Sequence, residues 1–326
     1  MTVDGNSTAR PEFEIAGVLA RPGGRIQVEI PLGRLISGTP VAIPTIVVHG
    51  SEPGPTVWVN AATHGDEIGG IEIVRRVLDT LDPRNLAGTF IAVPILNVHG
   101  FNTGDRYLPD RRDLNRSFPG SARGSLAARV ANLMMTEVVE RSDVGIDLHT
   151  GTDHRANLPQ IRGDLDDDMT RDLAERFGAP IAIHAKNRKG SLRAAAHRLG
   201  KPCLLFEGGE AYRFDQSAIV TATDGVLRVL HRLGMIDEIV PPAAIPPIAQ
   251  ESRWVRASSS GIVDCRLSLG DVVERGDEVA VLRDPFGTEL GRLKAPQRGM
   301  IVGQLQHPLV NKGDAIMHIA TLEAAS

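Results

Sequence analysis

Three residues of the chain have the types and positions that a bound metal ion needs. His64 and Glu67 stand three positions apart in the segment HGDE, which follows the apolar run TVWVN. An imidazole and a carboxylate at this spacing can converge on one ion if the segment closes into a helical turn. His149 ends a second apolar run, VGIDLH. Because ligands of open α/β sheets bind at the carboxyl ends of strands, we expect a His₂Glu set with a fourth position open for water. The alternatives are a chance H-x-x-E spacing and a histidine that only forms hydrogen bonds.

Two further segments carry residues for proton transfer and for binding an anion. Glu207 closes the apolar run PCLLFE, where apolar neighbours would raise the pKa of its carboxyl toward the range of a general base and acid. Asn115 and Arg116 lie in the proline-bounded segment RYLPDRRDLNRSFPG. Arginines on loops usually face water, but beside a metal site a guanidinium can bind a substrate carboxylate through two hydrogen bonds.

The elements that must position these residues are those of an α/β fold, because short apolar runs alternate with amphipathic segments between about residues 44 and 240. Strands covered on both faces are predicted at 45–49, 56–60, 89–96, 144–149, 180–184 and 202–207. Helices are predicted at 68–81, 125–142, 167–178 and 217–234, with Ser125 as an N-cap. We therefore expect a mixed, mostly parallel sheet flanked by helices.

A change in the residue pattern near the end of the chain predicts a second domain. The stretch PPAAIPPIAQ at residues 241–250 cannot continue a helix and is interpreted as a semi-rigid linker. Residues 1–240 would form the catalytic domain, with a possible β-rich extension up to about residue 40. Residues 251–326 show short apolar runs between glycine turns, which predicts a small all-β domain. Gly-Asp precedes an apolar run in both 269–282 and 309–319, which indicates an internal repeat.

Composition excludes two classes of partner. The formal net charge is −4 over 326 residues, so no basic field exists for nucleic acid or for an anionic membrane. No apolar run approaches the roughly 20 residues of a membrane span, and the N-terminal segment lacks the pattern of a secretory signal. We expect a cytoplasmic protein that binds a small molecule, possibly as a homo-oligomer. Cys203 and Cys265 are expected to be unpaired.

Four segments, in this order, resemble motifs of the succinylglutamate desuccinylase/aspartoacylase family of zinc carboxypeptidase-like hydrolases. They are HGDE at 64–67, the arginine-rich segment 106–120 with DLNRSFPG, DLHTG at 147–151 and FEGG at 206–209. The resemblance extends from about Val57 through the C-terminal domain. It implies one Zn²⁺ per chain, held by His64, Glu67 and His149, and hydrolysis of the amide bond of a small N-acylated amino acid or amine.

The same resemblance implies roles for the polar residues around the metal. Glu207 would act as the acid and base that activates the metal-bound water. Arg106 would polarise the scissile carbonyl, with Arg111 and Arg112 as competitors because the spacing to Asn115 is longer than in aspartoacylase.

Three further roles complete the implied site. Asn115 and Arg116 would hold the substrate carboxylate, and Asp113 would orient a ligand histidine. The segment HRANLPQIR at 154–162 is interpreted as a substrate-facing loop, with Arg155 and Asn157 as further candidates.

The C-terminal domain resembles the barrel-sandwich fold of biotinyl and lipoyl carriers. The turn that would present a modified lysine holds the segment DPFG at 284–287, and Lys294 belongs to the following run. We therefore expect a lid, a substrate gate or an oligomerisation surface rather than a carrier.

Two other functions remain open at this stage. One is a carboxypeptidase-like peptidase or amidase, which needs the same carboxylate clamp and activated water. The other is a non-catalytic metal-binding or interaction module, against which the complete His₂Glu set together with Glu207 argues.

Overall fold

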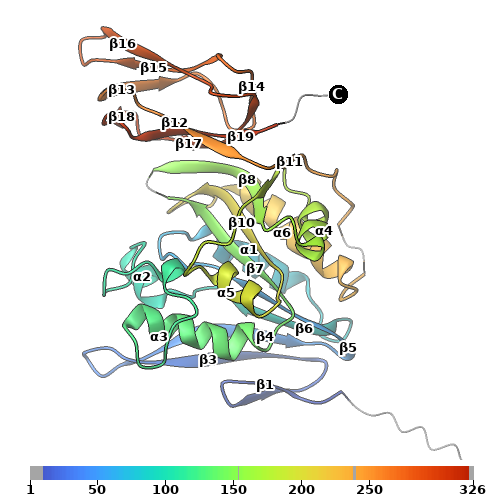
Figure 1. Ribbon diagram of the computed structural model, residues 1–326. Helices are drawn as coiled ribbons and strands as arrows, with labels where there is room; N and C mark the ends of the chain where they lie inside the picture. Colours follow the sequence, from blue (N-terminus) through green and yellow to red (C-terminus); the bar gives the residue numbers. More distant parts are fainter. Residues whose placement is uncertain (1–9, 153, 238–239, 323–326) are drawn as a thin grey trace, which may run out of the picture.

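The computed structural model describes residues 10–152, 154–237 and 240–322. One large sheet dominates it, built from β3 (Gly24–Arg34), β4 (Pro40–His49), β5 (Glu52–Asn60), β6 (Ala87–Val93), β7 (Val144–Gly151), β8 (Arg155–Gly163), β10 (Cys203–Glu210), β12 (Ser252–Arg256), β17 (Gly299–Leu305) and β19 (Ala315–Thr321). Their order across the sheet is β12-β19-β17-β8-β10-β7-β5-β6-β4-β3 (Figure 1). The short strands β9 (Ala182–His184), β11 (Ile248–Ala249) and β14 (Val272–Val273) pair at its sides.

The sheet is mixed, as predicted, with a parallel centre. β6, β5, β7 and β10 run parallel to one another. β4 and β8 flank this centre in the antiparallel sense, and β3 pairs with β4. The hairpin of β1 (Phe13–Ile15) and β2 (Val18–Ala20) precedes β3. Because the central strands are apolar on both sides, they require helices on both faces.

Helices cover the two faces of the parallel centre. On one face α1 (Gly69–Thr80), α4 (Asp168–Phe177) and α6 (Gln216–Arg232) pack on a core that includes Val59, Ile146 and Phe206. On the other face lie α3 (Leu126–Leu133), its π-helical continuation η2 (Met134–Val139) and α5 (Leu192–Arg198). The predicted N-cap of α3 is confirmed, since the Ser125 side chain accepts a hydrogen bond from the backbone N–H of Ala128.

The prediction of a loop at 154–162 was wrong, because this segment forms strand β8. Its sequence mixes polar residues with a proline and has no apolar run, so no strand was indicated. The strand exists because β10 pairs with it on one side and β17 on the other, which satisfies its backbone. The short helices α2 (Val98–Thr103) and α5 were also not predicted.

The C-terminal strands form two facing layers. β13 (Gly261–Cys265), β15 (Glu278–Arg283), β16 (Glu289–Lys294) and β18 (Leu309–Val310) make a separate antiparallel sheet. It packs on the C-terminal strands of the large sheet around a core of its own that includes Leu282 and Ile319. The predicted repeat appears as three like turns, in which the carboxylates of Asp271, Asp277 and Asp314 each accept a backbone N–H three residues earlier at 2.8 Å.

The C-terminal strands continue the sheet that carries the metal-binding motifs. β17 pairs antiparallel with β8 (Figure 1). β11, at the end of the proline-rich stretch, pairs with β9. The boundaries predicted for the catalytic domain, linker and β-domain stay predictions. No helix in the described ranges is long and apolar enough to cross a membrane.

Candidate metal centre

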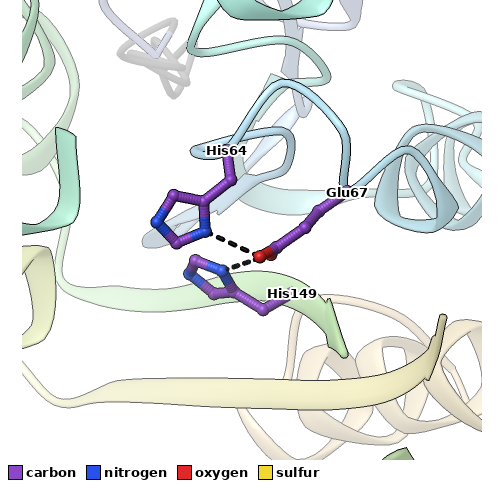
Figure 2. Close-up of side chains that lie close together, drawn as sticks. All are labelled: His64, Glu67 and His149. Atoms are coloured by element: carbon purple, nitrogen blue, oxygen red, sulfur yellow. Dashed lines mark hydrogen bonds and ion pairs between the residues drawn. The ribbon is translucent and has the colours of Figure 1, made fainter. Parts of the chain in front are cut away.

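The two histidines and the glutamate singled out from the sequence lie together (Figure 2). Their ligand atoms all lie within 4.8 Å of one another, and all three residues are buried. His64 Nδ1 lies 2.8 Å from Oε1 of Glu67, and His149 Nδ1 lies 2.7 Å from Oε2 of the same carboxylate. The loop from β5 to α1 supplies His64 and Glu67, while β7 supplies His149 near its carboxyl end. The three side chains therefore converge where the parallel strands end.

The loop that carries His64 and Glu67 is held against helix α2. A Cβ atom at Gly65 would lie 2.0 Å from the carbonyl carbon of Gly100, so only glycine permits this approach. The loop backbone is thus fixed by direct contact with the following helix. This contact explains why the motif needs a glycine between the two candidate ligands.

Each histidine meets a second carboxylate at its other ring nitrogen. His64 Nε2 lies 3.1 Å from Asp113 Oδ1, and His149 Nε2 lies 3.0 Å from Asp147 Oδ2. A carboxylate at Nε2 holds the tautomer that leaves Nδ1 free to bind a metal. Asp113 was predicted for this position, whereas Asp147 was not. The sequence did contain a signal for Asp147, because it lies two positions before His149 in a predicted strand and such residues share a face of the strand.

The charges around the three residues match a divalent cation. Burial alone would lower the pKa of His64, but the carboxylates of Glu67 and Asp113 outweigh it and raise that pKa. Burial would likewise lower the pKa of His149, yet Asp147 and Glu67 raise it well above its usual value. Burial would raise the pKa of Glu67, and the two histidines lower it well below its usual value.

Each imidazole thus faces a carboxylate at both of its ring nitrogens. Such an arrangement requires positive charge, either as additional protons on the imidazoles or as a cation between the two rings. Glu67, Asp113 and Asp147 are negative and the adjoining Arg106 is positive, so the formal sum is −2 with neutral histidines. A divalent ion balances this charge, and two imidazoles with one carboxylate are a donor set that Zn²⁺ favours. The residues present therefore fit the ion that the sequence analysis expects.

Arg106 lies beside this group, and its two competitors do not. Arg106 Nη1 lies 2.9 Å from Oε1 of Glu67, and its Nη2 lies 3.4 Å from Oδ2 of Asp113. Arg111 and Arg112 are both exposed on the same segment and do not line the cleft above the metal centre. Of the three arginines, the geometry brings only Arg106 to the candidate site.

Asn115 and Arg116 reach the same cleft from the 3₁₀ turn η1 (Leu114–Arg116). The Asn115 side chain is buried, and its Oδ1 accepts the backbone N–H of Leu192 at 2.9 Å. Its Nδ2 lies 3.4 Å from His149 Nε2. Arg116 donates to the carbonyl of Asn115 at 2.6 Å and is otherwise exposed toward the cleft. Arg116 is therefore better placed than Asn115 to meet a ligand anion.

Glu207 lies on β10 directly beside His149 of β7 in the strand register. Its Oε2 accepts a hydrogen bond of 2.9 Å from Nδ2 of Asn157, a residue predicted to contact substrate. Burial raises the pKa of Glu207, and the guanidinium of Arg162 opposes part of this shift. Burial thus shifts this carboxyl in the direction that a general acid and base uses.

The cleft has a volume of about 420 Å³ and a strongly basic lining. Among the residues that the structure describes, the cationic side chains that line the cleft are Arg106, Arg116, Arg155, Arg162, Lys186, Arg188 and Arg193. Among the described lining residues, the only carboxylates are those of Glu67 and Glu207. A protein with an overall negative charge thus concentrates positive charge here, which favours an anionic ligand.

Several lining residues were missed by sequence analysis because they come from distant segments. Lys186 and Arg188 follow no motif, Arg162 was not singled out within the segment 154–162, and Trp254 belongs to β12 of the C-terminal part. The guanidinium of Arg155, which was predicted to face substrate, lies 5.7 Å from the centre of the Trp254 ring. The C-terminal strands therefore supply part of the cleft wall.

Comparison with known proteins adds a family model and a curated relative. Residues 53–233 match the model of the succinylglutamate desuccinylase/aspartoacylase catalytic domain. The N-alpha-acetyl-L-2,4-diaminobutyric acid deacetylase of Halomonas elongata is 29% identical over 294 residues, which are 86% of this chain and 86% of that protein.

Solved structures share the whole architecture. A succinylglutamate desuccinylase/aspartoacylase from Rhodobacter sphaeroides superposes with a TM-score of 0.81 at 26% identity, covering 92% of this chain and 96% of the other. The product-bound ectoine utilization protein EutE (DoeB) from Ruegeria pomeroyi gives a TM-score of 0.82 at 23% identity, covering 91% and 95%. Both matches cover more than nine-tenths of this chain and so extend well beyond the motifs.

Proposed function

The chain belongs to the succinylglutamate desuccinylase/aspartoacylase family, and on this premise we propose that it hydrolyses the amide bond of a small N-acylated amino acid with the help of one Zn²⁺. The observation that carries the proposal is the shared orientation of His64 and His149, whose Nδ1 atoms both point at the carboxylate of Glu67. The name of the Halomonas relative supports a deacylase rather than a peptidase.

The ion would be held by His64, Glu67 and His149. When bound there, it supplies a Lewis acid that lowers the pKa of water and draws electron density from a carbonyl oxygen. Asp113 and Asp147 keep the two imidazoles in the tautomer that this binding requires.

The remaining steps belong to the protein's own side chains. Glu207 takes a proton from the attacking water and then gives it to the leaving nitrogen, so that a carboxylate and a free amine result. Arg106 places positive charge beside the oxygen on which negative charge develops. Arg116, with Asn115 next to it, binds the carboxylate of the amino acid and fixes the amide over the site. Arg155 is proposed as a further substrate contact.

Replacement of Glu207 tests the proposal. The variant Glu207→Ala should keep its bound zinc and lose at least about a hundredfold in kcat, which is the usual scale of a general base. Turnover is measured by release of free amine from N-acetyl-L-aspartate, N-succinyl-L-glutamate, N-acetyl-L-2,4-diaminobutyrate and a dipeptide, and metal content by atomic emission. Exposed Glu52 gives the matched control Glu52→Ala.

Two outcomes would reject the proposal. One is full turnover by Glu207→Ala, and the other is a wild-type enzyme that binds zinc yet releases no amine from any of the four compounds. Preference for the dipeptide would favour the peptidase alternative. We further propose a cytoplasmic enzyme, and an assembly of like subunits remains a prediction.

A further inference from the structure

We propose that the C-terminal strands take part in catalysis because Gly303 of β17 leaves the space in which Asn157 of β8 positions Glu207. The inference rests on the proposed role of Glu207 as acid and base. It assigns Asn157 as a positioning residue and Gly303 as the residue that permits its placement. The C-terminal part would then be an integral component of the active site.

The contact between Asn157 and Glu207 fixes which carboxyl oxygen carries the proton. Asn157 Nδ2 donates to Oε2 of Glu207 at 2.9 Å. An amide N–H can only donate, so Oε2 acts as the acceptor in both protonation states of Glu207. Proton exchange is therefore directed to Oε1, and the carboxyl plane is held in one orientation. A freely rotating carboxyl would spend part of its time in unproductive orientations.

Gly303 lies directly opposite Asn157 in the antiparallel pairing of β17 with β8. A Cβ atom at position 303 would lie 3.0 Å from Oδ1 of Asn157 and 3.2 Å from Cβ of His318. Both distances are shorter than ordinary van der Waals contacts, and the position is buried. A Cβ atom at position 303 would therefore press on the Asn157 amide, and a shift of this amide by a few tenths of an ångström would alter its hydrogen bond to Glu207.

A second contact between the same strands shows how firmly β17 orders this face of β8. The side chain of Gln160 is completely buried, and its Nε2 donates to the carbonyl of Val302 at 2.9 Å. Its Oε1 accepts from Nε of Arg162 at 3.1 Å. Gln160 is the register partner of Glu207 on β10. The strand that carries Gly303 thus also holds the β8 residue that lies opposite the general base.

Three variants test the inference in the full-length zinc enzyme, with whichever compound of the four above the wild type hydrolyses fastest. Asn157→Ala should lower kcat about tenfold while KM and zinc content stay unchanged, since the base is misoriented and substrate binding is intact. Gly303→Ala should lower kcat several-fold for the same reason. Gly291→Ala on β16 is the matched control, because a Cβ there would meet only Ser258 Oγ at 3.4 Å.

The double variant separates positioning from general destabilisation. If Gly303 acts through Asn157, adding Gly303→Ala to Asn157→Ala should cause no further loss of kcat. Multiplication of the two losses would overturn the role assigned to Gly303. A raised KM with unchanged kcat in Asn157→Ala would make Asn157 a substrate contact and overturn its positioning role. Should Gly303→Ala not fold, the split between kcat and KM in Asn157→Ala decides the central claim. A wild type without amidase activity would instead reject the proposed function.

Discussion

Oδ2 of Asp147 lies 3.0 Å from Nε2 of His149, and the carboxylate of Asp147 is completely buried. Its other oxygen, Oδ1, accepts hydrogen bonds from Asn60 and Thr63. The carboxylate is therefore fixed in place beside the outer nitrogen of the imidazole. The proposed binding of a metal ion should depend on this arrangement as well as on the three candidate ligands.

Asp147→Asn should weaken zinc binding by about ten- to a hundredfold. The amide oxygen would keep the bonds to Asn60 and Thr63, so the amide nitrogen would face His149. A donor at that position requires Nε2 to accept, which moves the ring proton to Nδ1 and blocks metal binding. Competition with a chromophoric chelator at constant pH measures the affinity. Asp79→Asn on the exposed surface of α1 is the control, and equal affinity in both variants would contradict the argument.

Arg116→Lys should raise KM for an N-acyl amino acid by about tenfold or more and change kcat little. The lysine keeps the charge but loses the paired hydrogen bonds to a carboxylate, and a bond to a charged group contributes about 1.5–3 kcal/mol. Steady-state kinetics provide both parameters. Arg111→Lys, on the exposed part of the same segment, should behave as the wild type. An unchanged KM in Arg116→Lys would remove Arg116 from substrate binding.

Substrates should be ranked by their charge. The described cleft lining has seven cationic side chains, and its two carboxylates, Glu67 and Glu207, are both assigned to the catalytic centre. We expect kcat/KM for N-acetyl-L-aspartate or N-succinyl-L-glutamate to exceed that for N-acetyl-L-2,4-diaminobutyrate by at least about tenfold, because the ammonium group of the latter would face this positive field.

Salt provides the control for this ranking. Raising the ionic strength should reduce the advantage of these two multiply charged anionic substrates, because screening weakens long-range attraction. The Halomonas relative is named for deacetylation of the diaminobutyrate compound. A faster reaction with the diaminobutyrate compound would therefore show that the basic lining does not set specificity in this chain.

His318 should make the fold sensitive to acid. The ring stacks on Trp254 with 4.4 Å between centroids, and burial, reinforced by the charge of Arg162, lowers the pKa of His318 to about 3. In the unfolded chain the pKa is near 6.5, so between these values only the unfolded state takes up the proton. Stability is therefore complete above pH 6.5 and is lost as the pH falls toward 3.

His318→Phe keeps the stacked ring and removes the titration. Between pH 7.5 and 5.0 the wild type should lose about 2 kcal/mol more in its free energy of unfolding than the variant, since each pH unit below 6.5 contributes about 1.4 kcal/mol. Urea titrations of the metal-free proteins in EDTA measure this difference without interference from metal release. Parallel pH dependence of the two proteins would show that His318 is protonated in the fold.

The sequence alone determined the parallel centre of the sheet and the convergence of His64, Glu67 and His149. Both follow from local rules, because apolar runs become buried strands and the polar residues at their carboxyl ends meet at one edge of the sheet. The family resemblance also implied Asp113 next to a ligand histidine, and Asp147 could have been found from strand alternation. These features depend on residues near one another in the sequence, or on the regular packing of parallel strands, whose carboxyl ends meet at one edge of the sheet.

Only the tertiary structure decided how the far end of the chain enters the site. Strand β8 has no apolar run, and its pairing with β17 joins residues almost 150 positions apart, so no local pattern reveals it. That pairing places Gly303 against Asn157 and turns a predicted substrate contact into a partner of Glu207. Trp254 lies in the cleft wall because its strand, β12, joins the same sheet through β19 and β17. The physical reason is that these contacts depend on the strand register between distant segments, which the packing of the whole molecule fixes.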